Sequence, residues 1–528
     1  MYKCPTCGAG LVFDPKSQNL LCLSCRNKYD PENVENERNM KLDQAKEITD
    51  FSDQSNNYEA VSYKCSHCGA ELITTDETIT TFCSFCRTGT MLDRKVVEKR
   101  KPDYIIPFSI TKEECEQIYL KKIKSAFFAP KSMLDSQEVK KIRGIYMPYW
   151  IYSFEKHGLV KSTGEKYSHR SGDYVYYDKF SLDTVIDASC SGITHDAASD
   201  FSDNLSEAIA PYSVKNKKIF SPAYLSGFYA DNEDVNEEIY SQESNEIANE
   251  DISNKLSKKP EYRKYNSKPY VEMKKGNVDL ALFPVYFLAT KNKTGDRISY
   301  AVINGQTGEI AADIPIDAKK MFTMSLLMAI PIFLVLNSLF TFNMPTMAIL
   351  SILFNVISWC ILSRQSRKIE KKEKNLDDRG VQFKKNKTSN GQPPKIEKNL
   401  NIKTKTLALF IIVFSAFLCY PLLSKIGISF MTFLRLIGFA AIIYLIISLI
   451  SNKTKNSESI TSSKPIFGLL ITLLVFCVHP ASDIYYYIAA IVSIILAILS
   501  FYDIISENNL LTTRKLPTLG KRGGDENA

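Results

Sequence analysis

The chain has 528 residues, a net charge of +8 at pH 7 and 13 cysteines, and this length predicts three or four structural units. The mean hydropathy of −0.14 conceals a polar N-terminal part and an apolar C-terminal part that cancel in the average. The first residues lack the apolar core of a secretory signal peptide, so we expect a reducing compartment in which regularly spaced cysteines bind metal. No phosphate-binding GxxxxGK[ST] motif is present, which argues against a helicase motor.

Two cysteine quartets near the N-terminus form an internal repeat at an offset of 61 residues. In each quartet, fourteen residues separate two C-x₂-C pairs; the ligands are Cys4, Cys7, Cys22 and Cys25, then Cys65, Cys68, Cys83 and Cys86. This spacing predicts two small β zinc ribbons, at 1–30 and 61–93, each holding one structural Zn²⁺ in a closed tetrahedron of thiolates. Gly8 and Gly69 are expected to turn the backbone with positive φ, and His67 is expected to be an exposed residue rather than a ligand.

The polar, acidic segment 31–60 predicts a linker, and 101–320 predicts an α+β cytoplasmic domain with a mostly antiparallel sheet. Thr111 and Glu114 form a capping-box pattern before a helix. Aromatic, β-branched stretches such as GIYMPYWIYSF indicate strands. Three histidines stand apart without matched acids or cysteines and are expected to be surface or sheet residues: His157, His169 and His195. We therefore predict no enzyme activity and no catalytic residues.

Long apolar runs after residue 320 predict an all-α transmembrane bundle of about six helices, because a membrane helix needs roughly 20 apolar residues. We expect three hairpins at 321–363, 407–450 and 466–505, with loops at 364–406 and 451–465 and a tail at 506–528. The short run that begins at Ile466 could instead form a re-entrant hairpin. Fourteen basic residues against five acidic ones in 364–406 predict a multi-pass protein of the cell membrane with both termini in the cytoplasm.

Three ionisable residues fall within or beside the apolar runs: Arg435, His479 and Asp483. Charged groups inside a membrane are candidates for function. These three lie near the expected outer ends of their helices, so we favour interfacial anchoring over a transport or proton path.

The layout resembles one bacterial family. The resemblance is carried by the duplicated ribbons, the phrases YIIPF, KSAFFAPK, IRGIYMPYWIY and NGQTGEIAADIPI, and the basic tail GKRGGDENA. It points to the zinc-ribbon membrane proteins found with phage-shock-protein-A homologues in envelope-stress modules. The resemblance implies a membrane anchor whose partners are a phage-shock-protein-A homologue, a flotillin-like zinc-ribbon protein and a paralogous membrane protein, together with membrane lipids. Only the eight ribbon cysteines carry over residue by residue.

Three functions remain as hypotheses. The first is a non-enzymatic membrane scaffold. Its N-terminal cytoplasmic part, stabilised by the two zinc sites, would recruit a phage-shock-A-like stress complex to the cytoplasmic face of the membrane. The second is a membrane-attached nucleic-acid-binding factor for replication or transcription, suggested by the ribbons and the positive charge. We do not favour it, because the ribbon aromatics are few and the 31–60 segment is acidic. The third is a transporter with a regulatory head.

Overall fold

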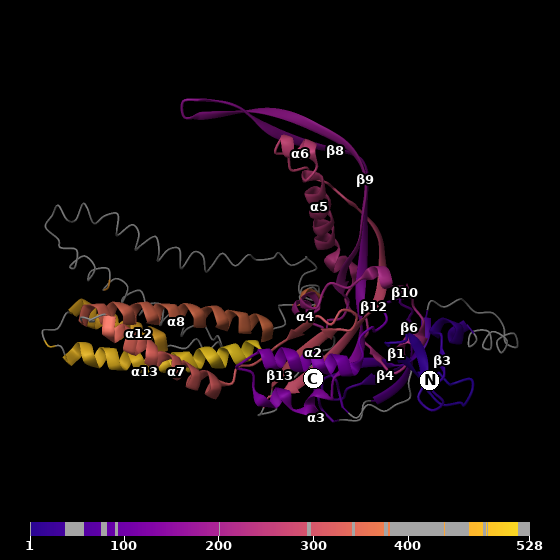
Figure 1. The fold of residues 1–528 in the computed structure, drawn as a ribbon, viewed down its shortest axis with the longest axis horizontal. Coiled ribbons are helices and arrows are strands. Elements are labelled where there is room, and N and C mark those ends of the chain that lie inside the picture. Colours follow the sequence, from indigo (N-terminus) through magenta and orange to yellow (C-terminus); the bar gives the residue numbers. More distant parts are fainter. Residues whose placement is uncertain are drawn as a thin grey trace, which may run out of the picture.

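The computed structural model describes residues 2–36, 57–74, 82–89, 93–199, 201–292, 297–339, 344–373, 378–380, 438, 464–478, 482 and 484–515. Within this part of the chain, a body built around a large sheet carries two projections (Figure 1). One projection is a bundle of helices from the C-terminal half. The other is a long two-stranded arm that rises from the body and bends over toward the side of the helices.

The sheet of the body is mixed, and most of its strand pairings are antiparallel. Its central strand, β12 (Lys274–Lys291), pairs antiparallel with β8 (Arg143–Ser171) and with β13 (Arg297–Asn304). Two pairings are parallel, β12 with β7 and β11 with β8. The shorter strands are β7 (Tyr104–Ile105), β10 (Lys218–Ile219), β11 (Tyr229–Ala230), β14 (Ile310–Ala312) and β15 (Arg514–Lys515). The middle of β12 is buried on both faces, as the apolar sequence LALFPVYFLA requires.

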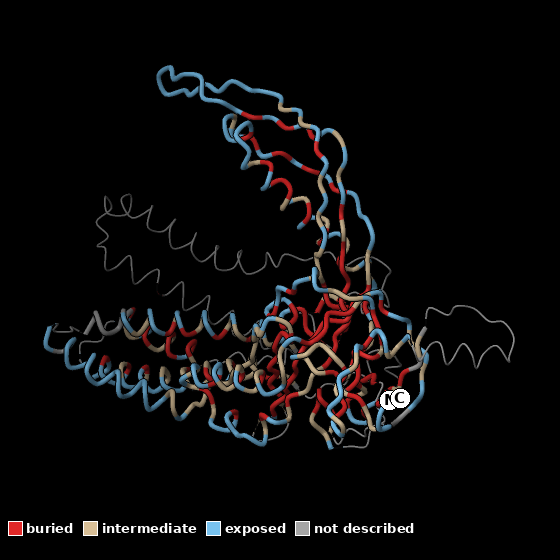
Figure 2. The backbone as a smooth tube through the Cα atoms, turned by 45° about the vertical axis from the view of Figure 1, so that its right-hand side comes forward, coloured by how far each residue is buried: buried red, intermediate tan, exposed pale blue. Residues whose placement is uncertain are grey.

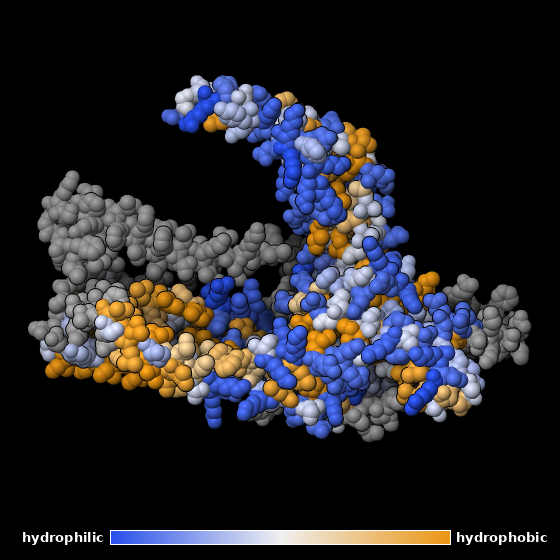
Figure 3. Space-filling model, viewed as in Figure 1, coloured by the Kyte–Doolittle hydropathy of each residue, from blue (hydrophilic) through white to orange (hydrophobic). Residues whose placement is uncertain are grey.

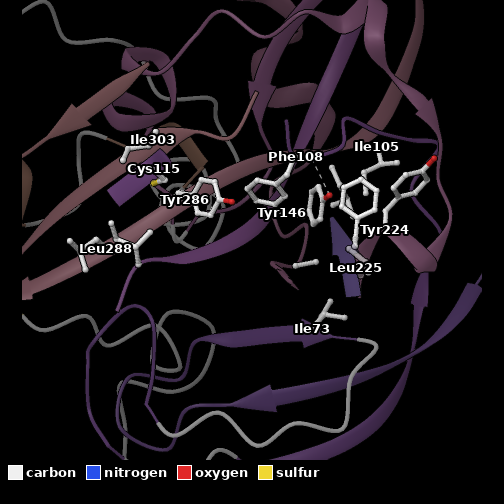
Figure 4. Packing of buried hydrophobic residues seen from close by; sticks show 14 of the residues in the cluster. Ile73, Ile105, Phe108, Cys115, Tyr146, Tyr224, Leu225, Tyr286, Leu288 and Ile303 are labelled. Atoms are coloured by element: carbon white, nitrogen blue, oxygen red, sulfur yellow. Dashed lines mark hydrogen bonds between the residues drawn. The ribbon is translucent and has the colours of Figure 1, made fainter. Parts of the chain in front are cut away.

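The backbone at the centre of the body is buried (Figure 2), and aromatic side chains fill this centre (Figure 4). Phe108 stacks on Phe228 with ring centroids 4.3 Å apart, and Tyr146 and Tyr286 each meet Phe108 at 4.8 Å. The Tyr146 hydroxyl also lies 3.4 Å from the backbone nitrogen of Phe108, which donates to it. These contacts join β8, β12 and the segment after β7 into one core.

Short helices cover this core. The expected capping box is confirmed: the Thr111 side chain accepts from the backbone N–H of Glu114, whose carboxylate accepts from the backbone N–H of Thr111. The α-helices are α2 (Lys112–Ser125), α3 (Ser136–Val139), α4 (Asp203–Ala208), α5 (Ser241–Ser257) and α6 (Pro260–Lys264). The 3₁₀ helices are η1 (Lys131–Leu134), η2 (Val214–Asn216), η3 (Pro222–Leu225) and η4 (Glu237–Tyr240).

The two cysteine repeats adopt different settings, and neither is the separate small domain that we expected. The first forms its own sheet of β1 (Leu11–Asp14), β2 (Asn19–Cys22) and β3 (Lys28–Tyr29). The second supplies β4 (Asn57–Lys64), β5 (Glu71–Thr74) and β6 (Asp93–Arg100) to the large sheet, through the pairing of β5 with β11. Phe13 packs on Tyr224 at 5.3 Å, so the first repeat also shares the core of the body.

The arm consists of the outer parts of β8 and of β9 (Tyr174–Asp196). The two strands pair antiparallel from Tyr149↔Asp196 to Ser171↔Tyr174. Bulges at Tyr152/Ser153 and Tyr167/His169 interrupt the register, and bulges bend a strand. Much of the ribbon is exposed (Figure 2), although among the described helices α5 packs along it and α4 packs on β9.

The expected all-α bundle of about six membrane helices is wrong for the described residues. They contain α7 (Ala318–Leu339), α8 (Met344–Glu373), α12 (Lys464–Val478) and α13 (Ile484–Leu511). Two of the described helices are long and apolar enough to cross a membrane, Ala318–Leu336 of α7 and the whole of α13. The hairpin expected at 407–450 lies outside the described residues, apart from residue 438.

Helix length and charge explain the difference. α12 has 15 residues, which gives a length of about 22 Å at ~1.5 Å per residue, short of the ~30 Å hydrocarbon core. α8 is longer, but from Arg364 onward it also carries Arg367 and Lys368, so only the part before Arg364 avoids the cost of basic residues inside a bilayer. Both helices also pack on α13 and on each other, with Ile466, Leu469 and Leu473 against the α8 side chains Ile352, Val356 and Trp359.

Candidate metal centres

Each C-x₂-C pair sits in the same backbone turn. In all four turns, the N–H four residues after the first cysteine donates to the carbonyl of that cysteine, at 2.8–3.0 Å. The donor residue has positive φ in every case: Gly8 at 73°, Arg26 at 61°, Gly69 at 79° and Arg87 at 58°. The two glycines were predicted to do this, and the prediction is confirmed. The positive φ of Arg26 and Arg87 was not predicted, because no sequence pattern identifies a non-glycine residue with positive φ.

The eight predicted ligands gather into two clusters, as the spacing required. Within each cluster, the four sulfur atoms lie within 4.8 Å of one another. The closest separations are 3.5 Å for Cys4–Cys25 and 3.4 Å for Cys7–Cys22 in the first cluster, and 3.7 Å for Cys65–Cys86 and 3.6 Å for Cys68–Cys83 in the second. A Zn–S distance of ~2.3 Å in a tetrahedron places sulfur atoms about 3.8 Å apart. Both clusters can therefore hold a metal ion of that size.

Hydroxyl groups adjoin the sulfur atoms. Tyr29 places its hydroxyl oxygen 3.4 Å from Cys4 Sγ, and Thr88 places Oγ1 3.2 Å from Cys86 Sγ. Burial alone would raise the pKa of the Cys4 thiol, but hydrogen bonds from Tyr29 and backbone N–H groups lower it to about 6. Such donors stabilise thiolates, which are the form that binds metal.

The two clusters differ in depth. All four sulfur ligands of the second cluster are buried, whereas Cys7 of the first is exposed and Cys25 is half-buried. Around the second cluster, the Phe85 ring meets Phe287 of β12 at 5.3 Å and the Tyr300 hydroxyl donates to the Phe85 carbonyl at 3.2 Å. The second cluster is therefore part of the core of the body, and its loss would leave a hole there.

The remaining ribbon residues have structural positions. His67 is exposed and is not one of the clustered ligands among the described residues, as we predicted. Phe13 and Phe85 are fully buried, so they pack the core instead of offering ring faces to bases. This removes two of the aromatic residues on which a nucleic-acid interface would have depended.

The Arg87 side chain connects the second cluster to the body through hydrogen bonds. Its Nη1 atom lies 2.6 Å from both Glu138 Oε2 and the carbonyl oxygen of Ala289 in β12. The partners of this guanidinium therefore lie in the body and not at the metal site. Partial burial acts to raise the pKa of Glu138, yet Lys141 and Arg87 together hold it below the usual value.

Arg87→Gly should therefore destabilise the body by about 2–3 kcal/mol, because a buried carbonyl and a carboxylate lose a charged donor. Glycine keeps the positive φ at this position, so the change tests the side chain alone. Arg26→Gly is the matched control, since Arg26 occupies the same turn position in the first repeat and is exposed; its effect should stay within about 0.5 kcal/mol. Thermal unfolding with metal analysis checks both. Equal destabilisation by the two changes, or loss of metal from Arg87→Gly, would contradict this role.

A polar cluster at the base of the arm was not predicted from the sequence. The His195 ring stacks on Tyr240 at 4.7 Å, and the Tyr240 hydroxyl donates to Asp203 at 2.8 Å. Arg379, in the segment after α8, donates from its backbone to Asp203 at 2.9 Å and pairs with Glu207 at 3.2 Å. Burial lowers the pKa of His195 to about 4. His195 is a sheet histidine as expected, but no local spacing could bring Arg379 to it.

His157 has an acid partner that its sequence position did not suggest, with Nδ1 2.8 Å from Asp187 Oδ1, yet both side chains are exposed. Arg435, His479 and Asp483 lie outside the described residues.

The chain is similar to the uncharacterized protein YdjG of Bacillus subtilis (strain 168), with 29% identity over 325 residues. The matched region is 61% of this chain and 91% of that protein. No family model matches the chain, and no solved structure is similar to it.

Proposed function

We propose that the protein is a non-enzymatic scaffold of the cell membrane that holds a metal-stapled body at the cytoplasmic face and binds a partner protein there. The observation that carries the proposal is the surface of the helices. α7 and α13 expose many large apolar side chains to the outside, among them Leu327, Phe333, Ile491 and Ile494, and Figure 3 displays this apolar surface along the helices. Exposed apolar surface of this extent is suited to a bilayer and not to water.

On each of the four C-terminal helices α7, α8, α12 and α13, a charged residue lies at one end of the apolar part. Lys320 begins the apolar part of α7, Arg364 ends that of α8, Lys464 begins α12 and Asp503 ends the apolar part of α13. Lys464 Nζ lies 2.8 Å from Asp503 Oδ1, which places two of these boundaries at one level. Lys320 Nζ also donates to the Ala129 carbonyl of the body at 2.7 Å, and these contacts support a single membrane surface on the side of the helices that faces the body.

Both ends of the helical region return to the body. Before α7, the backbone N–H of Ile316 donates to Asn509 Oδ1 at 2.7 Å. After α13, Arg514 and Lys515 pair with Ile298 and Arg297 of β13. If α7 and α13 cross the bilayer, this attachment keeps the residues before α7 and the residues that follow α13, as far as Lys515, on the same side of the bilayer. The basic segment 364–406 supports the cytoplasm as that side.

The metal centres are proposed to be structural zinc sites. Four thiolates fill a tetrahedral site and leave no open position for a water molecule or substrate. In this proposal zinc holds the body in shape, and the surface of the body does the binding. The expected partner is a phage-shock-protein-A homologue, and it comes from the family resemblance alone.

Site-specific photo-crosslinking in the full-length protein tests the proposal. A benzophenone amino acid would replace exposed apolar residues around the body, one at a time: Leu23, Phe127, Ile219 and Tyr270. The lipid-facing control is Phe333 in α7. Membranes holding each variant would be mixed with a purified phage-shock-protein-A homologue and irradiated. We expect an adduct of the two proteins from at least one body position and none from Phe333.

Failure would take two distinguishable forms. Adducts from no body position, with the protein present at wild-type level, would reject the phage-shock-protein-A homologue as the partner. Release of the full-length chain from membranes by alkaline carbonate would reject membrane integration itself.

A further inference from the structure

The tip of the arm, residues 166–179, carries a concentration of aromatic side chains that face outward. Its exposed rings are Tyr167, Tyr174, Tyr176 and Tyr177, and Tyr174 is 74% exposed. Tyr167 meets Tyr177 across the ribbon at 6.3 Å, and His169 stacks on Tyr176 at 4.6 Å. Globular surfaces rarely gather aromatic rings in this way unless they bind something.

The tip lacks support from the rest of the described chain. The last contacts between the arm and its flanking helices are at Tyr265, whose carbonyl accepts from Glu165 N–H at 2.5 Å and whose ring meets Phe180 at 4.5 Å. Beyond that point, the described residues provide no hydrogen bond or ring contact to 166–179 from outside the arm. An isolated two-stranded ribbon is only marginally stable in water, so a surface that receives these rings would also stabilise the strand pairing.

The arm reaches toward the proposed membrane surface. It extends sixteen residues from Glu155, the last partner of β12, to Ser171, or about 50 Å at ~3.3 Å per residue. In Figure 1 and in the turned view of Figure 2, the tip lies over the helices and not over the body. Lys372 ties α8 to Asp313 of the body, and the charged boundary residue Arg364 is eight residues away along the helix, only about 12 Å.

The chemistry of the tip suits the head-group layer of a bilayer better than its hydrocarbon core. Tyrosine has an apolar ring and a polar hydroxyl, and it concentrates at membrane–water interfaces for that reason. The tip is largely hydrophilic by residue hydropathy (Figure 3). Its charges nearly cancel, since Lys166, Arg170 and Lys179 are offset by Asp173 and Asp178, and Lys179 also lies 3.5 Å from Glu165. Partition of rings into the interface, and not anion binding, is therefore the attractive force.

We propose that the tyrosine-rich tip of the arm docks on the head-group layer of the same membrane that α7 and α13 enter, and so gives the body a second attachment point. This inference rests on the membrane attachment proposed above. The two attachments would fix the tilt of the body against the membrane, which one bundle of helices would leave free to vary.

Lipid crosslinking from the full-length protein tests the docking. The benzophenone amino acid would replace Tyr174 or Tyr177 at the tip, Val185 as an equally exposed control further down the arm, and Phe333 as a lipid-facing control in α7. The protein would be reconstituted into vesicles of phosphatidylcholine and phosphatidylglycerol, irradiated, and examined by mass spectrometry for covalent lipid. We expect adducts at Tyr174, Tyr177 and Phe333, several-fold above those at Val185.

Each contrary outcome has its own meaning. Adducts at Phe333 but only the Val185 level at both tip positions would overturn the docking and leave the membrane attachment standing. The absence of adducts at Phe333 would overturn the attachment itself. Protein adducts from the tip in native membranes, in place of lipid adducts, would also overturn the docking, because they would make the tip a protein-binding surface.

Discussion

Replacing Cys65 with serine should lower the metal content from two ions to one per chain and prevent the body from folding. Structural zinc contributes about 10–16 kcal/mol in small zinc-binding peptides, as much as the whole stability of a typical domain, about 5–15 kcal/mol. Because the second cluster lies in the core and its strands belong to the large sheet, the loss cannot stay local. The measurements are zinc per chain and the yield of monodisperse protein in detergent.

The first cluster supplies the contrast. Cys7→Ser should also remove one zinc, but it should destabilise the body less than Cys65→Ser does, because β1–β3 contribute no strand to the large sheet and Cys7 is exposed. Cys190→Ser, at a half-buried cysteine outside both clusters, should leave two ions per chain. The account of the second cluster would be refuted if the Cys65 variant kept two ions, or if it folded as stably as the Cys7 variant.

Phe108→Ala should destabilise the body by about 3–5 kcal/mol, the usual cost of emptying a large aromatic site in a core. Phe108 contacts three other aromatic rings, and its side chain is completely buried (Figure 4). Thermal unfolding of the detergent-solubilised chain would measure the change. Phe127→Ala is the control, because Phe127 is 64% exposed and its removal should cost less than about 0.5 kcal/mol.

Gly305 provides a sharper test of the same packing. A Cβ atom at this position would lie 2.5 Å from Cδ1 of Phe108, so Gly305→Ala should cost about 1–3 kcal/mol by overpacking. In the double variant Phe108→Ala/Gly305→Ala the added methyl group would enter space left by the ring. The double variant should therefore be destabilised by less than the sum of the destabilisations of the two single variants. Strict additivity would show that the two sites do not share this packing.

The second attachment point proposed for the arm changes what a scaffold of this kind could do. A body held by helices and by the arm keeps a defined orientation, so its partner-binding surface would face a fixed direction relative to the bilayer. The cluster around Asp203 and Arg379 joins the base of the arm to the segment after α8.

The sequence by itself determined the features that depend on short spacing. The C-x₂-C pairs predicted both ligand sets residue by residue, since a metal site needs only two tight turns and a suitable gap. The Thr111 capping box predicted the start of α2 for the same local reason. Hydropathy identified the apolar helices, but it overstated how many of the described ones are long enough to span a bilayer, because α12 has only 15 residues.

Only the tertiary structure decided how these parts are joined. Alternating polar and apolar residues in 159–186 fit a half-buried sheet and a free ribbon equally well. The two are distinguished by the end of the pairing between β8 and β12 at Glu155, beyond which β9 is the partner of β8 among the described strands. The second repeat joins the large sheet through the pairing of Ala230 with Ile73. The Arg379 cluster likewise brings together residues that are far apart in the chain. Pairings of this kind are selected by burial and hydrogen bonding over the whole fold, and no local pattern in the chain specifies them.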